Sequence, residues 1–230
     1  MDEKKHSDVK KAQSTLLVVV LSVLLFFGAQ LIGGLLFLPL QQFVSSQNIQ
    51  IAIFSAINLI VLVVLLGFSK ITSLKEAFGR RPTLKNMLMV LPLFVAYLCF
   101  TVALALIVKQ LFPSFDSNQA QDIGFAKNLS GIELLVAFVS LVIIVPVFEE
   151  IIFRGVLFRG LRKHIAFVPT TIVVSIVFAV AHLQWNLALD TFALSLALCW
   201  LLEKSNSLIP SITLHALKNS VAFLILFVVK

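Results

Sequence analysis

The chain has 230 residues, of which 60% are hydrophobic and 13% are charged, and its formal net charge is +7. A typical soluble domain is about half apolar and about a quarter charged, whereas the mean hydropathy here is +1.05. These values exclude a water-soluble globule, a disordered chain and a coiled coil, and they indicate that apolar surface faces lipid. Because the basic residues are scattered between apolar runs, they indicate cytoplasmic loops rather than a nucleic-acid-binding face.

The predicted elements are membrane-spanning helices. A span needs about 20 apolar residues at about 1.5 Å each, and lipid excludes open sheet edges. The first uncharged run, from Ala12 to Ser69, has room for two spans. In chain order the predicted spans are 14–38, 49–69, 86–108, 131–153, 166–184, 187–202 and 207–229. The expected fold class is therefore an all-α, polytopic transmembrane helix bundle of about seven spans, with room for an eighth short or interfacial element in the first run.

The lysines and arginines divide unequally between the two sets of connections. One set is rich in them, and the other holds only Lys109, Lys127 and Lys230. Short basic loops stay on the cytoplasmic side of a membrane. We therefore expect a multi-pass protein of the cell membrane with a cytoplasmic N-terminal segment, 1–13, and a single transmembrane domain, 14–230. The loop 70–85 is expected to be cytoplasmic and the loop 109–130 external.

Ionisable side chains in the fourth predicted span mark a candidate site, because each costs about 2.5–3.5 kcal/mol on insertion scales. Glu150 and Arg154 are four residues apart, in the order that favours a helical ion pair. Glu149 points about 100° away around the helix and is expected to stay unpaired. Pro146, just before it, is expected to kink the helix and free a backbone carbonyl. A charged cap at the inner end of the span would explain the Glu150–Arg154 ion pair. Such a cap would not require a second carboxylate at Glu149.

Two later spans each carry a histidine. Phe178 and His182 are four residues apart and share a helical face, and His215 and Asn219 have the same spacing on the last helix. A single buried histidine is most often a hydrogen-bonded core residue. Two of them, with a free carboxylate and an amide, supply the groups that activate a water and stabilise a tetrahedral oxyanion.

Two further charged residues, Asp190 and Lys218, are not assigned to the site. Asp190 lies near the outer end of its predicted span and is interpreted as reaching interfacial water, and Lys218 as snorkelling to the interface.

Three motifs follow in order in separate predicted spans: Glu149-Glu150-x-x-x-Arg154, Phe178-x-x-x-His182 and His215-x-x-x-Asn219. Together they resemble the signature motifs of the CPBP family. These are the CAAX proteases and bacteriocin-processing enzymes, also called Abi, which are related to the type II CAAX prenyl endopeptidase. The resemblance covers the motif-bearing core, 145–220. It implies an intramembrane endopeptidase that hydrolyses a peptide bond in a membrane-associated peptide or protein by means of a glutamate-activated water.

The resemblance also implies a role for each motif residue. Glu149 would be the general base, and His182 would help bind and activate the water. His215 and Asn219 would form the oxyanion hole. Three residues would orient the site: Glu150, Arg154 and Phe178.

The same residues leave the question of a metal open. The family is commonly labelled as metalloproteases, and Glu149, His182 and His215 could bind zinc as a His₂Glu catalytic site, with Glu150 as the base. The HExxH pattern of zincins is missing from the sequence. An amide such as Asn219 is a good oxyanion donor and a poor zinc ligand. We therefore favour a peptidase without a cofactor and keep a divalent metal such as zinc as the alternative.

The depths of these residues in the membrane do not match at first sight. At about 1.5 Å per residue, Glu149 and His215 lie on the order of 15 Å from their basic inner boundaries, and His182 lies about 20–25 Å from its own. The three converge only if the fifth span tilts or starts below the membrane surface, or if 154–164 is partly re-entrant.

Two other functions compete with the peptidase. A non-enzymatic bacteriocin self-immunity protein would keep the same fold, but the intact motifs favour the enzyme. A small transporter would use Glu149 and His182 as a proton relay, but the sequence has no inverted repeat and no matched pair of broken helices. The expected partners are membrane lipids and a peptide or membrane-protein substrate, with no nucleic acid.

Overall fold

The computed structural model describes residues 78–115, 129, 131–182 and 184–229, together with five single positions before them. Within these ranges every regular element is a helix, and one isolated antiparallel bridge joins Gly79 to Ser207. The all-α prediction is confirmed for this part of the chain. The predicted spans 14–38 and 49–69 and the N-terminal segment 1–13 lie outside it, apart from those single positions.

The described helices fall into three groups along the chain. The first group consists of the helices α4 (Leu84–Leu88) and α5 (Val90–Leu111). A long helix follows in five stretches, of which two are π-helical: α6 (Ile132–Phe138), η1 (Val139–Ile144), α7 (Val145–Glu149), η2 (Glu150–Phe158) and α8 (Arg159–Arg162). The last group is α9 (Phe167–Ala181), α10 (Trp185–Ser205), α11 (Leu208–Phe223) and η3 (Leu224–Val228).

Three helical stretches of the described chain are long and apolar enough to cross a membrane: Leu84–Leu111, Ile132–Arg162 and Leu208–Val228. They coincide with three predicted spans: 86–108, 131–153 and 207–229. The predicted spans 166–184 and 187–202 are also helical, as α9 and α10, but α9 is shorter than a span needs. The total of seven spans stays a prediction.

A proline interrupts the hydrogen bonding of the long helix. In η1 the backbone N–H of Val145 donates to the carbonyl of Ser140, five residues back. In that register the next N–H would belong to residue 146, which is Pro146 and has none. The Leu141 carbonyl therefore needs another donor, and Nδ2 of Asn219 on α11 donates to it at 2.9 Å. Pro146 thus leaves the Leu141 carbonyl without a donor in its own helix, as the sequence predicts. The hydrogen bond from Asn219 to this carbonyl links α11 to the long helix.

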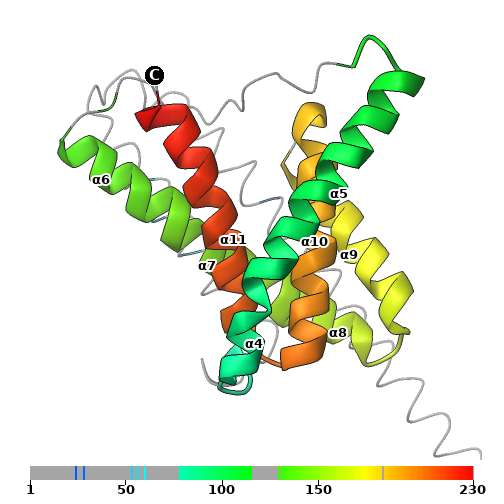
Figure 1. The fold of residues 1–230 in the computed structure, drawn as a ribbon. Helices are drawn as coiled ribbons and strands as arrows, with labels where there is room; N and C mark the ends of the chain where they lie inside the picture. The colour runs from blue at the N-terminus through cyan, green and yellow to red at the C-terminus, as the bar shows by residue number, and fades with distance from the viewer. Residues whose placement is uncertain are drawn as a thin grey trace, which may run out of the picture.

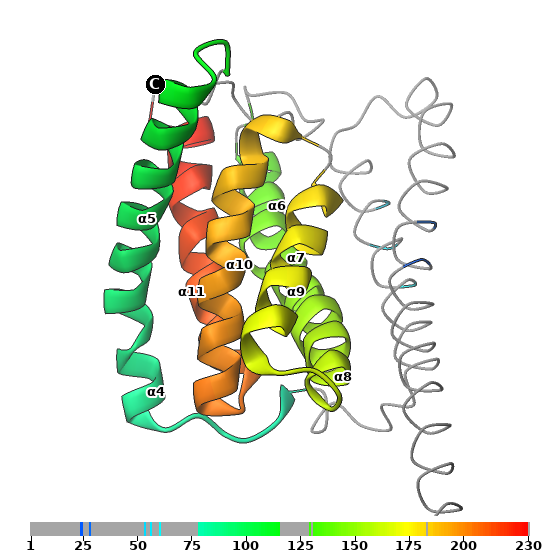
Figure 2. The same cartoon turned by 90° about the vertical axis from the view of Figure 1, so that its right-hand side faces the viewer.

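Helix α10 lies at the centre of the bundle. Figures 1 and 2 show α5 and α11 on one side of it and α9 on the other. Five of its residues are at most 1% exposed: Leu194, Ser195, Leu198, Cys199 and Leu201. By contrast, α5 exposes a row of large apolar side chains from Leu91 to Leu111. An apolar surface of this extent is suited to lipid contact.

The described connections gather at two opposite ends of the bundle (Figure 2). At one end the backbone N–H of Arg80 donates to the Asn206 carbonyl at 2.9 Å, and Arg162 pairs with Glu203 at 2.8 Å. Gly79 is required there because its φ is +76°, and an added Cβ would lie 2.5 Å from the Asn206 carbonyl oxygen. The end of α5 and the C-terminus lie at the other end. Which end is cytoplasmic stays a prediction.

Candidate active site

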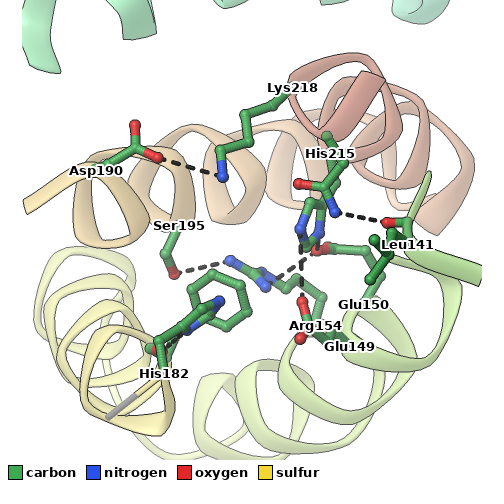
Figure 3. A network of polar contacts seen from close by, with 11 residues as sticks. Leu141, Glu149, Glu150, Arg154, His182, Asp190, Ser195, His215 and Lys218 are labelled. Carbon is green, nitrogen blue, oxygen red and sulfur yellow. Dashed lines mark hydrogen bonds and ion pairs between the residues drawn. The ribbon is translucent and has the colours of Figure 1, made fainter. Parts of the chain in front are cut away.

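The long helix and helices α9, α10 and α11 face one another around a group of polar side chains (Figure 3). The figure shows side chains from all four elements pointing toward the middle of this ring of helices. They include five of the predicted site residues: Glu149, Glu150, Arg154, His182 and His215. Residues that are up to 66 positions apart, Glu149 and His215, therefore belong to one network.

The predicted ion pair between Glu150 and Arg154 is confirmed and fully buried. Arg154 Nη1 lies 3.0 Å from Glu150 Oε1, and both side chains are 0% exposed. Arg154 Nη2 donates to Ser195 Oγ on α10 at 2.8 Å. The guanidinium group also lies over the ring of Phe178 on α9, with its Cζ 4.4 Å from the ring centroid. Arg154 therefore ties the long helix to two neighbouring helices.

His215 lies between the two adjacent carboxylates. Its Nδ1 is 2.9 Å from Glu150 Oε1, and its Nε2 is 3.5 Å from Glu149 Oε2. A carboxylate paired with arginine only accepts hydrogen bonds, so the hydrogen-bond network assigns a hydrogen to Nδ1. Nε2 is then the ring nitrogen that faces the Glu149 carboxyl group, at an ion-pair distance of 3.5 Å.

Glu149 and Glu150 occupy different environments although they are neighbours in sequence. The Glu149 side chain is 21% exposed, whereas that of Glu150 is 0% exposed. The two carboxylates therefore point apart, as the helical geometry predicts. The expectation that Glu149 is unpaired is wrong, because His215 from α11 faces it. The sequence could not show this contact, since it depends on how two distant helices are rotated.

Phe178 connects His182 to the rest of the network. The Phe178 ring meets the His182 ring edge-on at 4.8 Å and the His215 ring at 5.9 Å. His182 Nδ1 lies 2.8 Å from the Phe178 carbonyl oxygen. A carbonyl only accepts, so Nδ1 carries the hydrogen, and Nε2 is the acceptor of the neutral ring. Phe178 lies one helical turn, about 6 Å, nearer the basic end than His182. Its ring therefore spans part of the difference in depth between His182 and His215 that the sequence led us to expect.

The described part of the long helix continues to Arg162, so 154–162 is helical, and whether 154–164 re-enters the membrane stays a prediction. Asn219 lies one turn beyond His215 on α11 and donates to the Leu141 carbonyl. An amide has two N–H groups, and this contact uses one of them.

The histidine and acidic side chains of the described chain do not assemble a metal site. No group of three or more His, Cys, Asp or Glu residues in these ranges is arranged to hold a metal ion. Glu149 and His215 are adjacent, but His182 joins them through the Phe178 ring. As arranged, the three predicted zinc ligands do not form a His₂Glu centre.

A second, partly buried network was not expected from the sequence. Lys218 Nζ on α11 lies 3.3 Å from Asp190 Oδ2 on α10, and the Tyr97 hydroxyl on α5 donates to Asp190 Oδ1. The sequence did not show that Asp190 and Lys218 pair with each other, and their interpretation as interfacial side chains stays a prediction. Ser195 was missed as well. Nothing in the sequence distinguishes Ser195 from the other serines, because its partner Arg154 lies on another helix.

The comparisons with known proteins match the part of the chain that carries these residues. Residues 131–221 match the family model described as "Type II CAAX prenyl endopeptidase Rce1-like". This segment is therefore similar to the Rce1-like family. The match contains all three motifs, and the resemblance to the CPBP family is confirmed.

A protein of Lactococcus lactis is also similar to part of the chain. The chain is 32% identical over 106 residues to "UPF0177 protein YxdF" of Lactococcus lactis subsp. lactis (strain IL1403), covering 45% of this chain. The matched region spans 57% of the length of that relative. No solved structure matches the chain significantly.

Proposed function

We propose that this protein is an intramembrane endopeptidase in which Glu149 activates a water to hydrolyse a peptide bond. One observation supports this most directly. Of two adjacent carboxylates, Glu150 is sealed against Arg154, whereas Glu149 keeps 21% exposure and faces His215. Two carboxylates held in such different environments are suited to two different tasks. Glu150 holds the network, and Glu149 is available to exchange a proton.

The proposed reaction begins with a water held between Glu149 and His182. Nε2 of the neutral His182 ring accepts a hydrogen bond from this water, and the Glu149 carboxylate takes its proton. The water oxygen then bonds to the carbonyl carbon of the peptide. When the C–N bond breaks, the proton on Glu149 passes to the leaving amine, which restores the carboxylate. Phe178, which holds His182 through its carbonyl, positions that ring.

His215 and Asn219 are the proposed donors to the oxyanion of the tetrahedral intermediate. Because Nδ1–H of His215 is engaged by Glu150, the ring can donate to an oxyanion only through Nε2–H, as an imidazolium. In the proposed resting state Nε2 also carries a proton, and Glu149 is a carboxylate that is able to act as a base. One protonation state thus supplies both the base and the donor. Asn219 would add the N–H that Leu141 does not use.

Zinc catalysis remains the alternative mechanism on the same residues. Glu149, His182 and His215 would hold the metal, which would supply a Lewis acid for a bound water. We prefer the metal-free reaction, because the amide of Asn219 is a good oxyanion donor and a poor zinc ligand.

The test is a cleavage assay with purified protein in lipid nanodiscs and a defined library of apolar 20-residue peptides, read by mass spectrometry. The Glu149→Gln variant is compared with Glu133→Gln, which makes the same chemical change in the first turn of α6 on the same long helix. We expect cleavage by the wild type and by Glu133→Gln, and none by Glu149→Gln. Equal cleavage by both variants would refute the proposed role of Glu149.

A further inference from the structure

A short surface that combines leucines and a lysine lies where α4 leads into α5. Leu84, Leu88 and Leu91 are 75%, 66% and 65% exposed, and their spacing along the helical stretch Leu84–Leu111 places them in one row. Lys85, next to Leu84, is also exposed. Three exposed leucines are unfavourable in water, whereas leucines beside a lysine are typical of the level at which acyl chains meet lipid headgroups.

The adjoining end of α10 carries a tryptophan and a second lysine. Lys204 Nζ lies 6.0 Å from the centroid of the Trp200 ring. Trp200 and Met89, the residue that joins α4 to α5, pack against the same apolar cluster around Val90, and α4 also contacts α10. Figures 1 and 2 both show α4 beside the end of α10. Because tryptophan is enriched at the headgroup level of membranes, Lys204 and Lys85 belong to one headgroup level.

Arg81 lies between α4 and the turn that follows α10. On one side of it the backbone N–H of Arg80 donates to the carbonyl of Asn206 in that turn, at 2.9 Å. On the other side the Thr83 hydroxyl accepts from the backbone N–H of Asn86 and caps α4. The chain is thus held on both sides of Arg81, whose side chain is exposed. Arg81 therefore adds a third cation to the edge between α4 and α10.

These three cations have no carboxylate partner in the described part of the chain. The acidic side chain at this end of the described helices is Glu203, and it pairs with Arg162 at 2.8 Å. Arg81, Lys85 and Lys204 form no ion pair within the described ranges. Three positive charges beside a row of exposed leucines are complementary to an anion that carries apolar chains.

We propose that Arg81, Lys85 and Lys204, together with the leucine row, form a lipid surface that binds an anionic phospholipid. The cations contact the phosphate, and an acyl chain lies along the leucines. The occupant is a lipid rather than a soluble anion because the apolar row continues along α5 through exposed Val95 and Leu98. A zwitterionic lipid is a weaker match, since its own cation cancels the charge of its phosphate. The lipid surface is independent of the proposed peptidase reaction.

The test is thermal unfolding of the purified full chain in a nonionic detergent, during titration with phosphatidylglycerol or with phosphatidylcholine of the same acyl chains. A lipid that binds the folded state raises the melting temperature. We expect phosphatidylglycerol to act at a lipid concentration about 100-fold lower, because each lysine or arginine near an anionic headgroup contributes about fivefold in affinity. Glycerol phosphate, which offers the anion without the chains, should have no effect at the same concentrations.

Single substitutions locate the lipid surface. Lys85→Gln and Lys204→Gln should each weaken the preference for phosphatidylglycerol about fivefold, and the triple variant with Arg81→Gln should abolish it. Lys163→Gln is the matched control at the same end, because this exposed lysine follows α8, which Figures 1 and 2 show on the other side of α10 from α4. Lys109→Gln is the control at the opposite end of α5. Both controls should keep the wild-type preference.

Three results would overturn the lipid surface. The first is an equal rise of the melting temperature with both phospholipids in the wild type. The second is an equal loss of preference in Lys163→Gln and Lys85→Gln, which is the result for diffuse attraction to the whole basic end. The third is an equal effect of glycerol phosphate, which is the result for a soluble anion. Because the melting temperatures are measured without a peptide, the outcome does not depend on whether the protein cleaves peptides.

Discussion

His215 Nδ1 lies 2.9 Å from Glu150 Oε1, in a contact that is sealed from solvent. Glu150 is itself neutralised by Arg154, so it acts on the reaction centre through His215. It fixes the orientation of the imidazole ring and the nitrogen that carries hydrogen, and it leaves Nε2 directed at Glu149. A carboxylate that orients a histidine in this way is a positioning group.

Glu149→Gln should remove peptide cleavage while the protein stays folded. Glutamine keeps the size of the side chain but cannot take a proton, and loss of a general base costs about 10²–10⁴ in rate. The Glu150–Arg154 pair and the Arg154–Ser195 hydrogen bond do not involve this side chain, and a glutamine amide can still hydrogen-bond His215 Nε2, so the melting temperature in detergent should change little. Cleavage rates in nanodiscs and thermal unfolding are the measurements. Cleavage at the wild-type rate would show that the activity lies at another site.

Arg154→Ala should destabilise the protein strongly, and a second change should restore part of the loss. Removing one partner of a buried pair leaves the other uncompensated, at about 3–5 kcal/mol. The double variant Glu150→Gln with Arg154→Ala should therefore unfold at a higher temperature than Arg154→Ala alone. Arg162→Ala is the control, because its pair with Glu203 is about one-third exposed and should contribute about 0–1 kcal/mol. Equal thermal stability of the double and single variants would contradict the pair.

The contacts within single helices could be predicted from the sequence. Glu150 and Arg154 meet, and the rings of Phe178 and His182 touch at 4.8 Å. Residues four apart lie on one helical face in any surroundings, so these pairs need no knowledge of the fold. The consequence of Pro146 is equally local, because a residue without an N–H leaves a carbonyl unpaired in its own helix.

The contacts between helices could not be predicted in this way. The donors and acceptors that join different helices include Ser195 for Arg154, Leu141 for Asn219 and Tyr97 for Asp190. A helix that is apolar on all sides has no pattern that selects its inward face, and α9 is of this kind. Its rotation is set by packing and interhelical hydrogen bonds. The same limit explains why the sequence showed Glu149 as unpaired.

Single cysteines at the two ends of the bundle should label from opposite sides of the membrane. Lys163→Cys lies at the basic end, and Ser114→Cys lies just after α5 at the other end; both side chains are exposed. The background has Cys99 and Cys199 replaced by serine. Basic loops stay in the cytoplasm. A membrane-impermeant maleimide added to intact cells should therefore label Ser114→Cys, and it should label Lys163→Cys only after the cells are lysed. The reverse pattern would invert the predicted orientation.

Asn219→Ala and chelators together should decide between the metal-free reaction and zinc catalysis. In the metal-free reaction Asn219 donates to an oxyanion that exists only beyond the ground state, so its loss should lower kcat by about 10²–10³ and leave KM nearly unchanged. Because the same side chain binds the Leu141 carbonyl, thermal unfolding must be measured as well. Ser220→Ala is the control, since it removes a hydrogen bond within the same helix, to the Ala216 carbonyl. The wild type should stay active in excess EDTA or phenanthroline. Two results together would contradict the glutamate mechanism: chelators abolish the activity and stoichiometric zinc restores it, and Asn219→Ala is nearly as active as Ser220→Ala. These results would support a zinc mechanism and leave the resemblance to the family unchanged.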